Sequence, residues 1–182
     1  MTGAITDAIL AEWTEKGYAR MSMEAVARRA GVGKSALYRR WESKQQMALA
    51  VLDDVHVAAV IAPDMGSLEG ELNGLITAMQ AWLAHPQIGP IMADLVAETT
   101  RDPELGHAVE TFARVPYRAQ AYEIFDRANA RGELHAATDR EVGVEPIASI
   151  MFWRNISRAE PPTEDYLRKV IATICRGCRS TG

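Results

Sequence analysis

Two short helical patterns, separated by the turn Gly31–Gly33, occupy the segment 23–41, and they constrain the fold more than any other feature of the sequence. Ser22 is a suitable N-cap for the first pattern, and Gly31 ends it after about two turns. Apolar residues recur at helical spacing on both sides of the turn, at Val26, Ala30, Leu37 and Trp41. The segment therefore predicts two short helices joined as a helix-turn-helix.

The pentapeptide GVGKS within this segment also looks like the end of a nucleotide-binding phosphate loop. Such a loop needs a glycine five residues before the glycine of its GK[ST] motif, and it connects a strand to a helix. Arg28 stands five residues before Gly33, and the preceding residues have the spacing of a helix instead of a buried strand. Both requirements fail, so nucleotide binding is not expected here.

A helix-turn-helix binds DNA by placing its second helix in the major groove. The two helices cross closely, which requires a small residue such as Ala27, and the turn requires a residue that tolerates positive φ, such as Gly31. The polar face of the second helix is then free to contact DNA. The candidate groove-facing residues are Gly33, Lys34, Ser35, Tyr38 and Arg39.

Charge is distributed unevenly along the chain. The formal net charge of the 182 residues is −4, which alone argues against a nucleic-acid-binding protein. Residues 1–52, however, carry eight Lys and Arg against five Asp and Glu, a net charge of +3, and the remainder carries −7. A cationic N-terminal portion on an acidic body indicates that one end meets a polyanion.

Helix signals continue to the C-terminus, and strand signals are nearly absent. Pro116 and Pro146 fall inside helical patterns: Pro116 predicts a kink or a division into two helices, and Pro146 predicts a kink or a late helix start. Further N-caps are expected at Ser43 (with Gln46), Asp102 (before Pro103), Thr138 (with Glu141) and Thr163. The expected fold class is all-α, with three short helices followed by about six longer ones.

The stretch EKGYARMSMEAVARRAGVGKSALYRRWESKQQMALAV resembles the DNA-binding pattern of the tetracycline-repressor (TetR) family of transcriptional regulators. The resemblance rests on a first helix ending in a glycine-aromatic pair, on the helix-turn-helix, and on an aromatic-x-Ser-Lys junction to a connecting helix. It covers about the first 50 residues. It implies a DNA-binding domain at residues 1–46 and a larger helical domain for effector binding and dimerisation at residues 47–182.

The resemblance also assigns residues to DNA. Tyr38 would contact a backbone phosphate through its hydroxyl, Lys44 would hold a phosphate at the start of the connecting helix, and Ser22 would cap its helix and approach a phosphate. Lys34, Ser35 and Arg39 are candidates for base edges or neighbouring phosphates. Phosphate contacts position a protein without specifying sequence, so only a minority of these residues are expected to read bases.

The larger domain of a TetR-like protein pairs with a second copy through its last two helices and holds a small-molecule effector among its middle helices. The dimer candidates are Ile147, Ile150, Met151, Phe152, Leu167, Val170, Ile171 and Ile174. The effector candidates are Met79, Trp82, Met92, Phe112, Tyr117, Tyr122 and Trp153, although such apolar stripes are more often ordinary core. A two-fold dimer predicts a palindromic operator.

The resulting hypothesis is a cytoplasmic, homodimeric TetR-like regulator that binds double-stranded DNA as a repressor and is released by a small molecule. No apolar run approaches the roughly 18 residues of a membrane span, and no signal peptide is recognisable. Cofactors, metals and catalytic residues are not expected, and Cys175 and Cys178 are interpreted as reduced thiols at a fraying helix end. The alternatives are a helical small-molecule-binding protein or enzyme, and a protein-interaction adaptor.

Overall fold

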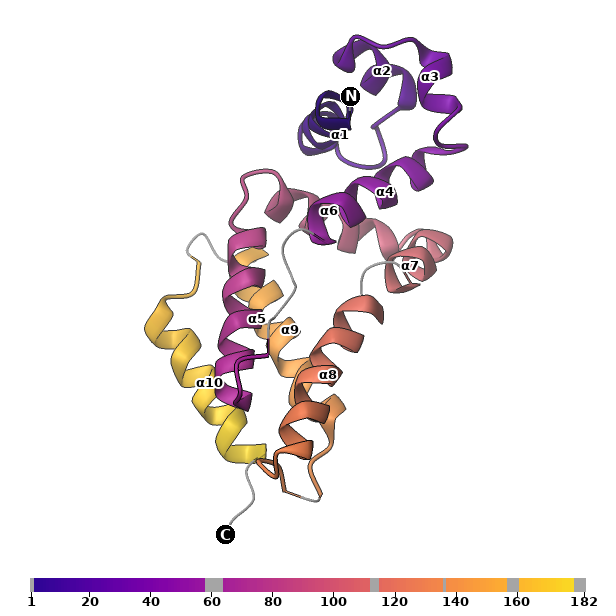
Figure 1. Ribbon diagram of the computed structural model, residues 1–182. Helices are drawn as coiled ribbons and strands as arrows, with labels where there is room; N and C mark the ends of the chain where they lie inside the picture. Colours follow the sequence, from indigo (N-terminus) through magenta and orange to yellow (C-terminus); the bar gives the residue numbers. More distant parts are fainter. Residues whose placement is uncertain (1, 58–63, 112–114, 136, 157–160, 179–182) are drawn as a thin grey trace. The chain divides into compact units, whose positions relative to one another are not determined.

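The computed structural model describes residues 2–57, 64–111, 115–135, 137–156 and 161–178, and this part of the chain contains ten helices (Figure 1). The helices are α1 (Thr2–Lys16), α2 (Met23–Ala30), α3 (Lys34–Tyr38), α4 (Lys44–Val57), α5 (Leu68–Leu83), α6 (Ile88–Thr99), α7 (Pro103–Val109), α8 (Val115–Ala130), α9 (Arg140–Ile156) and α10 (Glu164–Cys178). The all-α fold class is confirmed. None of these helices is both long enough and apolar enough to cross a membrane.

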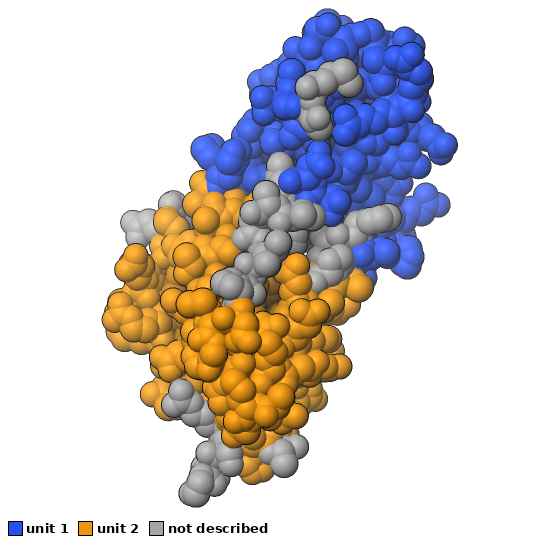
Figure 2. Space-filling view, viewed as in Figure 1, with its two compact units in different colours: residues 1–57, 85–114 blue, residues 58–84, 115–182 orange. Residues whose placement is uncertain are grey.

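The chain forms two compact units, coloured separately in Figure 2. Unit 1 consists of residues 1–57 and 85–114, and unit 2 of residues 58–84 and 115–182. The expected boundary after residue 46 falls inside α4, and unit 1 includes α6 and α7 as well as the helix-turn-helix. The N-terminal helices are therefore packed together with two helices that follow much later in the sequence.

Unit 1 is built around α1, which contacts α2, α4 and α6. Its buried face carries Ile5, Ile9 and Trp13, which are each at most 3% exposed and recur at helical spacing. Gly17 ends α1 with a φ of 75°, and its N–H donates to the carbonyl of Trp13 at 2.8 Å. The small helix α2 thus rests on a buried face of a longer helix, and α3 packs on α2.

Unit 2 is built around α5, which contacts α8, α9 and α10. Leu72, Leu75 and Ile76 of α5 are at most 1% exposed and form the buried side of an amphipathic helix. Glu71 lies on the same buried face with 0% exposure, which the hydrophobic pattern did not predict. Its carboxylate binds Arg127 of α8 and Arg131, the residue that follows α8.

Most of the expected N-caps are confirmed. The side chains of Ser22, Ser43, Asp102 and Thr163 each accept a hydrogen bond from a backbone N–H two or three residues later. The capping box expected at Thr138 and Glu141 is wrong, because α9 begins one residue later and Asp139 accepts from the N–H of Glu141 at 2.9 Å. The hydroxyl of Thr138 instead donates to the carbonyl of Cys178 at the end of α10, at 3.0 Å.

The carbonyl of Cys178 also accepts from the N–H of His135 at 2.8 Å. Both Cys175 and Cys178 are buried free cysteines, and burial raises the pKa of the Cys178 thiol. The interpretation of these thiols as a fraying helix end is therefore wrong. The end of α10 is held by hydrogen bonds from the loop that leads into α9, which satisfies a helix-terminal carbonyl.

The prolines act in two different ways. The long pattern around Pro116 is divided, because α7 ends at Val109 and α8 begins at Val115. Proline is tolerated there because the first N–H groups of a helix have no partner within it. Pro146 lies inside α9, which begins at Arg140, so a late helix start at this proline is wrong.

We expect Gly143→Ala to destabilise unit 2 by about 1–3 kcal/mol although alanine favours helix. A Cβ at Gly143 would lie 2.5 Å from Cε1 of Phe125, a side chain with 0% exposure, so the buried ring would have to move. The matched control is Gly74→Ala on α5, where nothing lies within 4 Å of the added Cβ and a gain of up to about 1 kcal/mol is expected. Urea unfolding followed by circular dichroism measures both changes, and a stabilised Gly143→Ala variant would contradict the packing.

Candidate nucleic-acid interface

The turn between α2 and α3 has the geometry that the sequence predicts. Gly31 has a φ of 66°, and its N–H donates to the carbonyl of Arg28 at 3.3 Å. Ala27, at the predicted helix crossing, is 3% exposed, and Val26 and Leu37 are fully buried. A side chain at Gly31 would be strained by the left-handed backbone even though the space around it is open. The turn geometry and these buried contacts therefore hold the two short helices together as a helix-turn-helix.

The groove-facing candidates of α3 are brought together on one exposed surface. Lys34, Ser35, Tyr38 and Arg39 are exposed, and Gly33 immediately before them is exposed with an extended backbone. The positive start of the helix and these donors suit a polyanion. Exposed donors of this kind are those that contact a DNA backbone.

Lys34 and Tyr38 both contact Glu24 of α2. The Nζ atom of Lys34 lies 2.5 Å from Oε1 of Glu24, and the hydroxyl of Tyr38 donates to the same oxygen at 3.1 Å. The hydrogen bond from Lys34 is the main reason that the pKa of Glu24 lies below its ordinary value. In return, Glu24 raises the pKa of Lys34. An acidic residue thus stands within the cationic surface.

The other two candidates, Ser22 and Lys44, are engaged within unit 1. Ser22 is half-buried, and its Oγ accepts from the N–H of Ala25 at 3.2 Å. The ammonium of Lys44 donates to the carbonyls of Tyr18 and Ala19 at 2.8 and 3.3 Å, and it lies 4.3 Å from the centre of the Tyr18 ring. Burial lowers the pKa of Lys44. Lys44 therefore ties α4 to the loop after α1, and a phosphate would compete with these carbonyls for its protons.

Asp94 of α6 holds the C-terminal end of α1 and the loop after it by accepting two hydrogen bonds, a role that no local sequence pattern predicts. Its Oδ2 accepts from Nε1 of Trp13 at 2.8 Å and from the N–H of Tyr18 at 2.7 Å. Gly17 leaves room for this carboxylate, since a Cβ there would lie 3.1 Å from Oδ1 of Asp94. The buried indole N–H is a signal that a polar partner must exist, but a sequence does not identify a partner 81 residues away.

We expect Asp94→Ala to destabilise unit 1 by about 2–3 kcal/mol, because it leaves the N–H of a fully buried indole without an acceptor. Asp94→Asn keeps a carbonyl oxygen at the same place and should cost less. Tryptophan fluorescence during urea unfolding measures the loss. Asp54→Ala removes an exposed carboxylate from α4 of the same unit and is the control, with an expected change below about 0.5 kcal/mol. Equal losses for the two alanine variants would contradict the role of Asp94.

Comparison with known families decides the class of protein. The family described as "Bacterial regulatory proteins, tetR family" matches residues 5–51, and the family "Tetracyclin repressor-like, C-terminal domain" matches residues 62–174. The chain belongs to the TetR family. It is a helix-turn-helix DNA-binding transcriptional regulator and not an enzyme.

Curated relatives and solved structures agree with this assignment. The HTH-type transcriptional regulator YdeS of Bacillus subtilis is 24% identical over 167 residues, covering 92% of this chain and 84% of its own. The DNA-binding transcriptional repressor TetR of Mycobacteroides abscessus is 26% identical over 162 residues, covering 87% and 83%. The TetR-family regulator SCO0332 has the same fold, with a TM-score of 0.77, 23% identity and 98% coverage of both chains.

The effector candidates of this TetR-family chain are distributed over both units. Met79 and Tyr117 are buried in unit 2, and Trp82 is half-buried there, whereas Met92 belongs to unit 1. Phe112 lies outside the described residues. Tyr122 is half-buried, with the guanidinium of Arg140 4.7 Å from the centre of its ring, and Trp153 is 66% exposed.

The dimer candidates divide into two groups of four. Those at most 5% exposed are Ile147, Met151, Leu167 and Ile171, which form part of the core of unit 2 within one chain. Those half-buried are Ile150, Phe152, Val170 and Ile174. The periodicity located the apolar side of each helix, but it did not distinguish the face that packs on α5 from the face beside it.

Proposed function

We propose that this TetR-family regulator is a homodimeric repressor that binds a palindromic operator and is released by a small-molecule effector. The observation that carries the proposal is an apolar surface on the last two helices, termed the dimer face. On α9 it consists of Val142, Pro146, Ile150 and Trp153, and on α10 of Tyr166, Val170 and Ile174. Each of these residues is half-buried or exposed within one chain.

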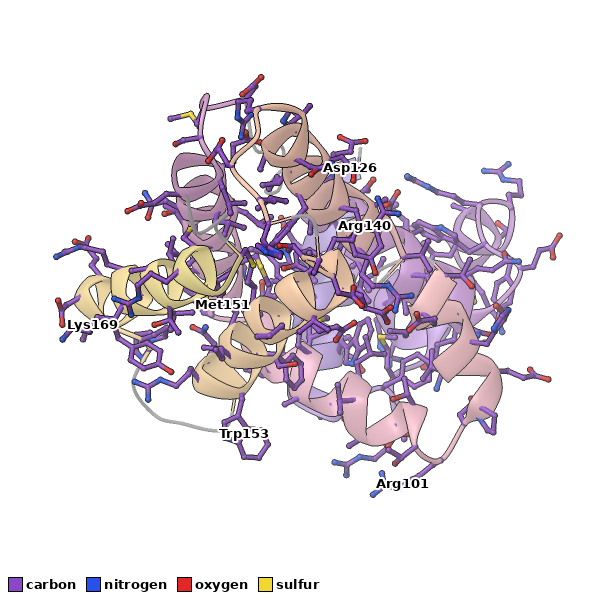
Figure 3. The ribbon with its side chains drawn as sticks, turned by 90° about the horizontal axis from the view of Figure 1, so that it is seen from below. Arg101, Asp126, Arg140, Met151, Trp153 and Lys169 are labelled. Carbon is purple, nitrogen blue, oxygen red and sulfur yellow. The ribbon has the colours of Figure 1, made fainter. Side chains whose placement is uncertain are left out.

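The dimer face has the features of an interface between copies. Val142 and Trp153 are 68% and 66% exposed, and Trp153 points away from the helices in Figure 3. Both α9 and α10 pack on α5, and the guanidinium of Arg154 on α9 lies 4.2 Å from the Tyr166 ring on α10. Exposed aromatic side chains on an apolar patch commonly mark a partner site. A second copy related by two-fold symmetry would present the same face in return.

The effector site is proposed to include Tyr117 of α8. This side chain is 9% exposed, and its hydroxyl has no hydrogen-bond partner among the described residues. Burial raises the pKa of Tyr117, and the charge of Glu145 raises it further, so the phenol stays neutral and can donate a proton. A buried hydroxyl without a partner costs about 1–3 kcal/mol. A ligand with a hydrogen-bond acceptor would offset that cost.

The descriptions of two solved structures with the same fold mention small molecules. One is the transcriptional regulator FadR from Bacillus subtilis in complex with stearoyl-CoA, with a TM-score of 0.78 and 13% identity over 97% of this chain and 96% of its own. The other is the flavonoid-responsive regulator FrrA, with a TM-score of 0.72 and 16% identity over 99% and 100%. Acyl-CoA thioesters and flavonoids are therefore the first compounds to test.

Sequencing the genomic DNA fragments that the purified protein binds tests the operator. Sedimentation measures the mass of the protein in solution and so tests the dimer. The proposal predicts an inverted repeat with half-sites about one helical turn apart, bound by twice the 20.0 kDa of one chain. An effector should lower operator affinity, and operator should lower effector affinity by the same factor. A monomer that ignores every duplex at low salt, or that binds a protein partner without salt dependence, would contradict the proposal.

A further inference from the structure

Glu24 places a carboxylate among the side chains that face DNA. It is the second residue of α2, and 46% of its side chain is exposed. The side chain of Lys34 is 59% exposed, and Tyr38 is 43% exposed. All three groups are therefore accessible to a DNA backbone, and in the free protein they are bound to one another.

The contacts to Glu24 use the groups that a phosphate would need. Tyr38 has a single hydroxyl proton, and it is directed at Oε1 of Glu24 at 3.1 Å. The same oxygen is 2.5 Å from the ammonium of Lys34, which lies 5.4 Å from the centre of the Tyr38 ring. The carboxylate neutralises this cation and repels phosphate at the same place. A phosphate oxygen accepts the same two hydrogen bonds as a carboxylate oxygen.

We propose that Glu24 is an internal competitor of the DNA backbone. In the free protein it holds Lys34 and Tyr38 in place, and duplex binding exchanges its carboxylate for a phosphate oxygen on both side chains. Because phosphate contacts are independent of sequence, the competition lowers affinity for every duplex. Glu24 thereby limits non-specific binding to the chromosome and lowers the salt dependence of DNA binding by about one phosphate contact.

The test is Glu24→Gln, which keeps the shape of the side chain and removes its charge. We expect the variant to bind an arbitrary duplex of about 25 base pairs roughly fivefold more tightly at about 0.1 M salt, with a log K against log salt slope steeper by about 0.9. Fluorescence anisotropy measures both quantities, and circular dichroism verifies the fold. Glu104→Gln, an equal change of charge at an exposed position of α7, is the control and should alter affinity by less than about twofold.

Tyr38→Phe adds a second readout that does not depend on net charge. In the wild type the hydroxyl is bound to Glu24, so its removal should weaken DNA binding less than its removal in the Glu24→Ala background, where no side-chain oxygen at position 24 accepts from it. Glu24→Ala should also tighten binding, which guards against an effect peculiar to glutamine. The proposal is overturned if Glu24→Gln leaves affinity unchanged or weakens it for any duplex, or if Tyr38→Phe has equal effects in both backgrounds.

Discussion

Replacing Trp153 by glutamate should convert the proposed dimer into a monomer and weaken operator binding by about 100-fold or more. Trp153 is the most exposed aromatic side chain described on the dimer face, and a charge there would be buried without a partner in any two-fold pairing. A dimer gains affinity because its second recognition helix binds at a high effective concentration, and this advantage amounts to about 10²–10⁴-fold. Sedimentation velocity and anisotropy with operator DNA measure the two effects.

The matched control is Met65→Glu, which places the same charge on an exposed apolar residue of unit 2 that lies outside the dimer face. It should remain dimeric and bind operator like the wild type. The Trp153 variant should retain the weak binding of a monomer to a single half-site, because the helix-turn-helix belongs to unit 1. A dimeric Trp153→Glu protein with unchanged operator affinity would show that copies associate through another surface.

The sequence predicted the helices well because their signals are local. A cap such as Ser22, or a left-handed glycine such as Gly31, acts on a backbone within a few residues of itself, and both have the predicted geometry. The N-cap predicted at Thr138 is wrong for a reason that is also local. Asp139, the next residue, competes for the role of cap, and the hydroxyl of Thr138 is drawn to the carbonyl of Cys178.

The polar contacts that organise the interface could not be predicted in the same way. Asp94 and Trp13 are far apart in sequence, and nothing local distinguishes Asp94 from a solvated surface acid. Glu24 looks like a favourable acid at a helix N-terminus, and its contacts with α3 exist only after the turn is formed. Lys44 was assigned to phosphate from resemblance, whereas the structure directs its ammonium to the carbonyls of Tyr18 and Ala19.

Glu71 is the clearest case of a residue that departs from its hydrophobic pattern. Its carboxylate is 0% exposed and accepts from Nε of Arg127 at 2.8 Å, with Nη2 of the same guanidinium close to the same oxygen. Nη2 of Arg131 lies 2.9 Å from the other oxygen, and Arg131 also binds Glu133 at 2.6 Å. Glu133 in turn accepts from the N–H of Leu68, the first residue of α5. This network joins the start of α5 to the end of α8.

Arg127→Ala should therefore destabilise unit 2 by about 3–5 kcal/mol, because it leaves the buried carboxylate of Glu71 with only one cation. The expected fall in Tm is about 10 °C for a chain of this size. Glu71→Gln should cost less, since the guanidinium of Arg127 is about one-third exposed and can be hydrated once the carboxylate is gone. Differential scanning calorimetry measures these changes. Arg168→Ala, which breaks an exposed pair with Asp165, is the control and should cost below about 1 kcal/mol.

The double variant Arg127→Ala/Glu71→Gln distinguishes two causes for the loss of stability, namely an uncompensated buried charge and a loss of packing contacts. If the cost of Arg127→Ala arises from an uncompensated carboxylate, then adding Glu71→Gln removes that charge and should recover part of the stability. If the cost arises from lost side-chain contacts alone, the second substitution should add to the first. Recovery would show that the Glu71 carboxylate is a buried charge that is compensated by the guanidinium groups of Arg127 and Arg131. Additive losses, or an Arg127→Ala variant as stable as Arg168→Ala, would contradict that interpretation.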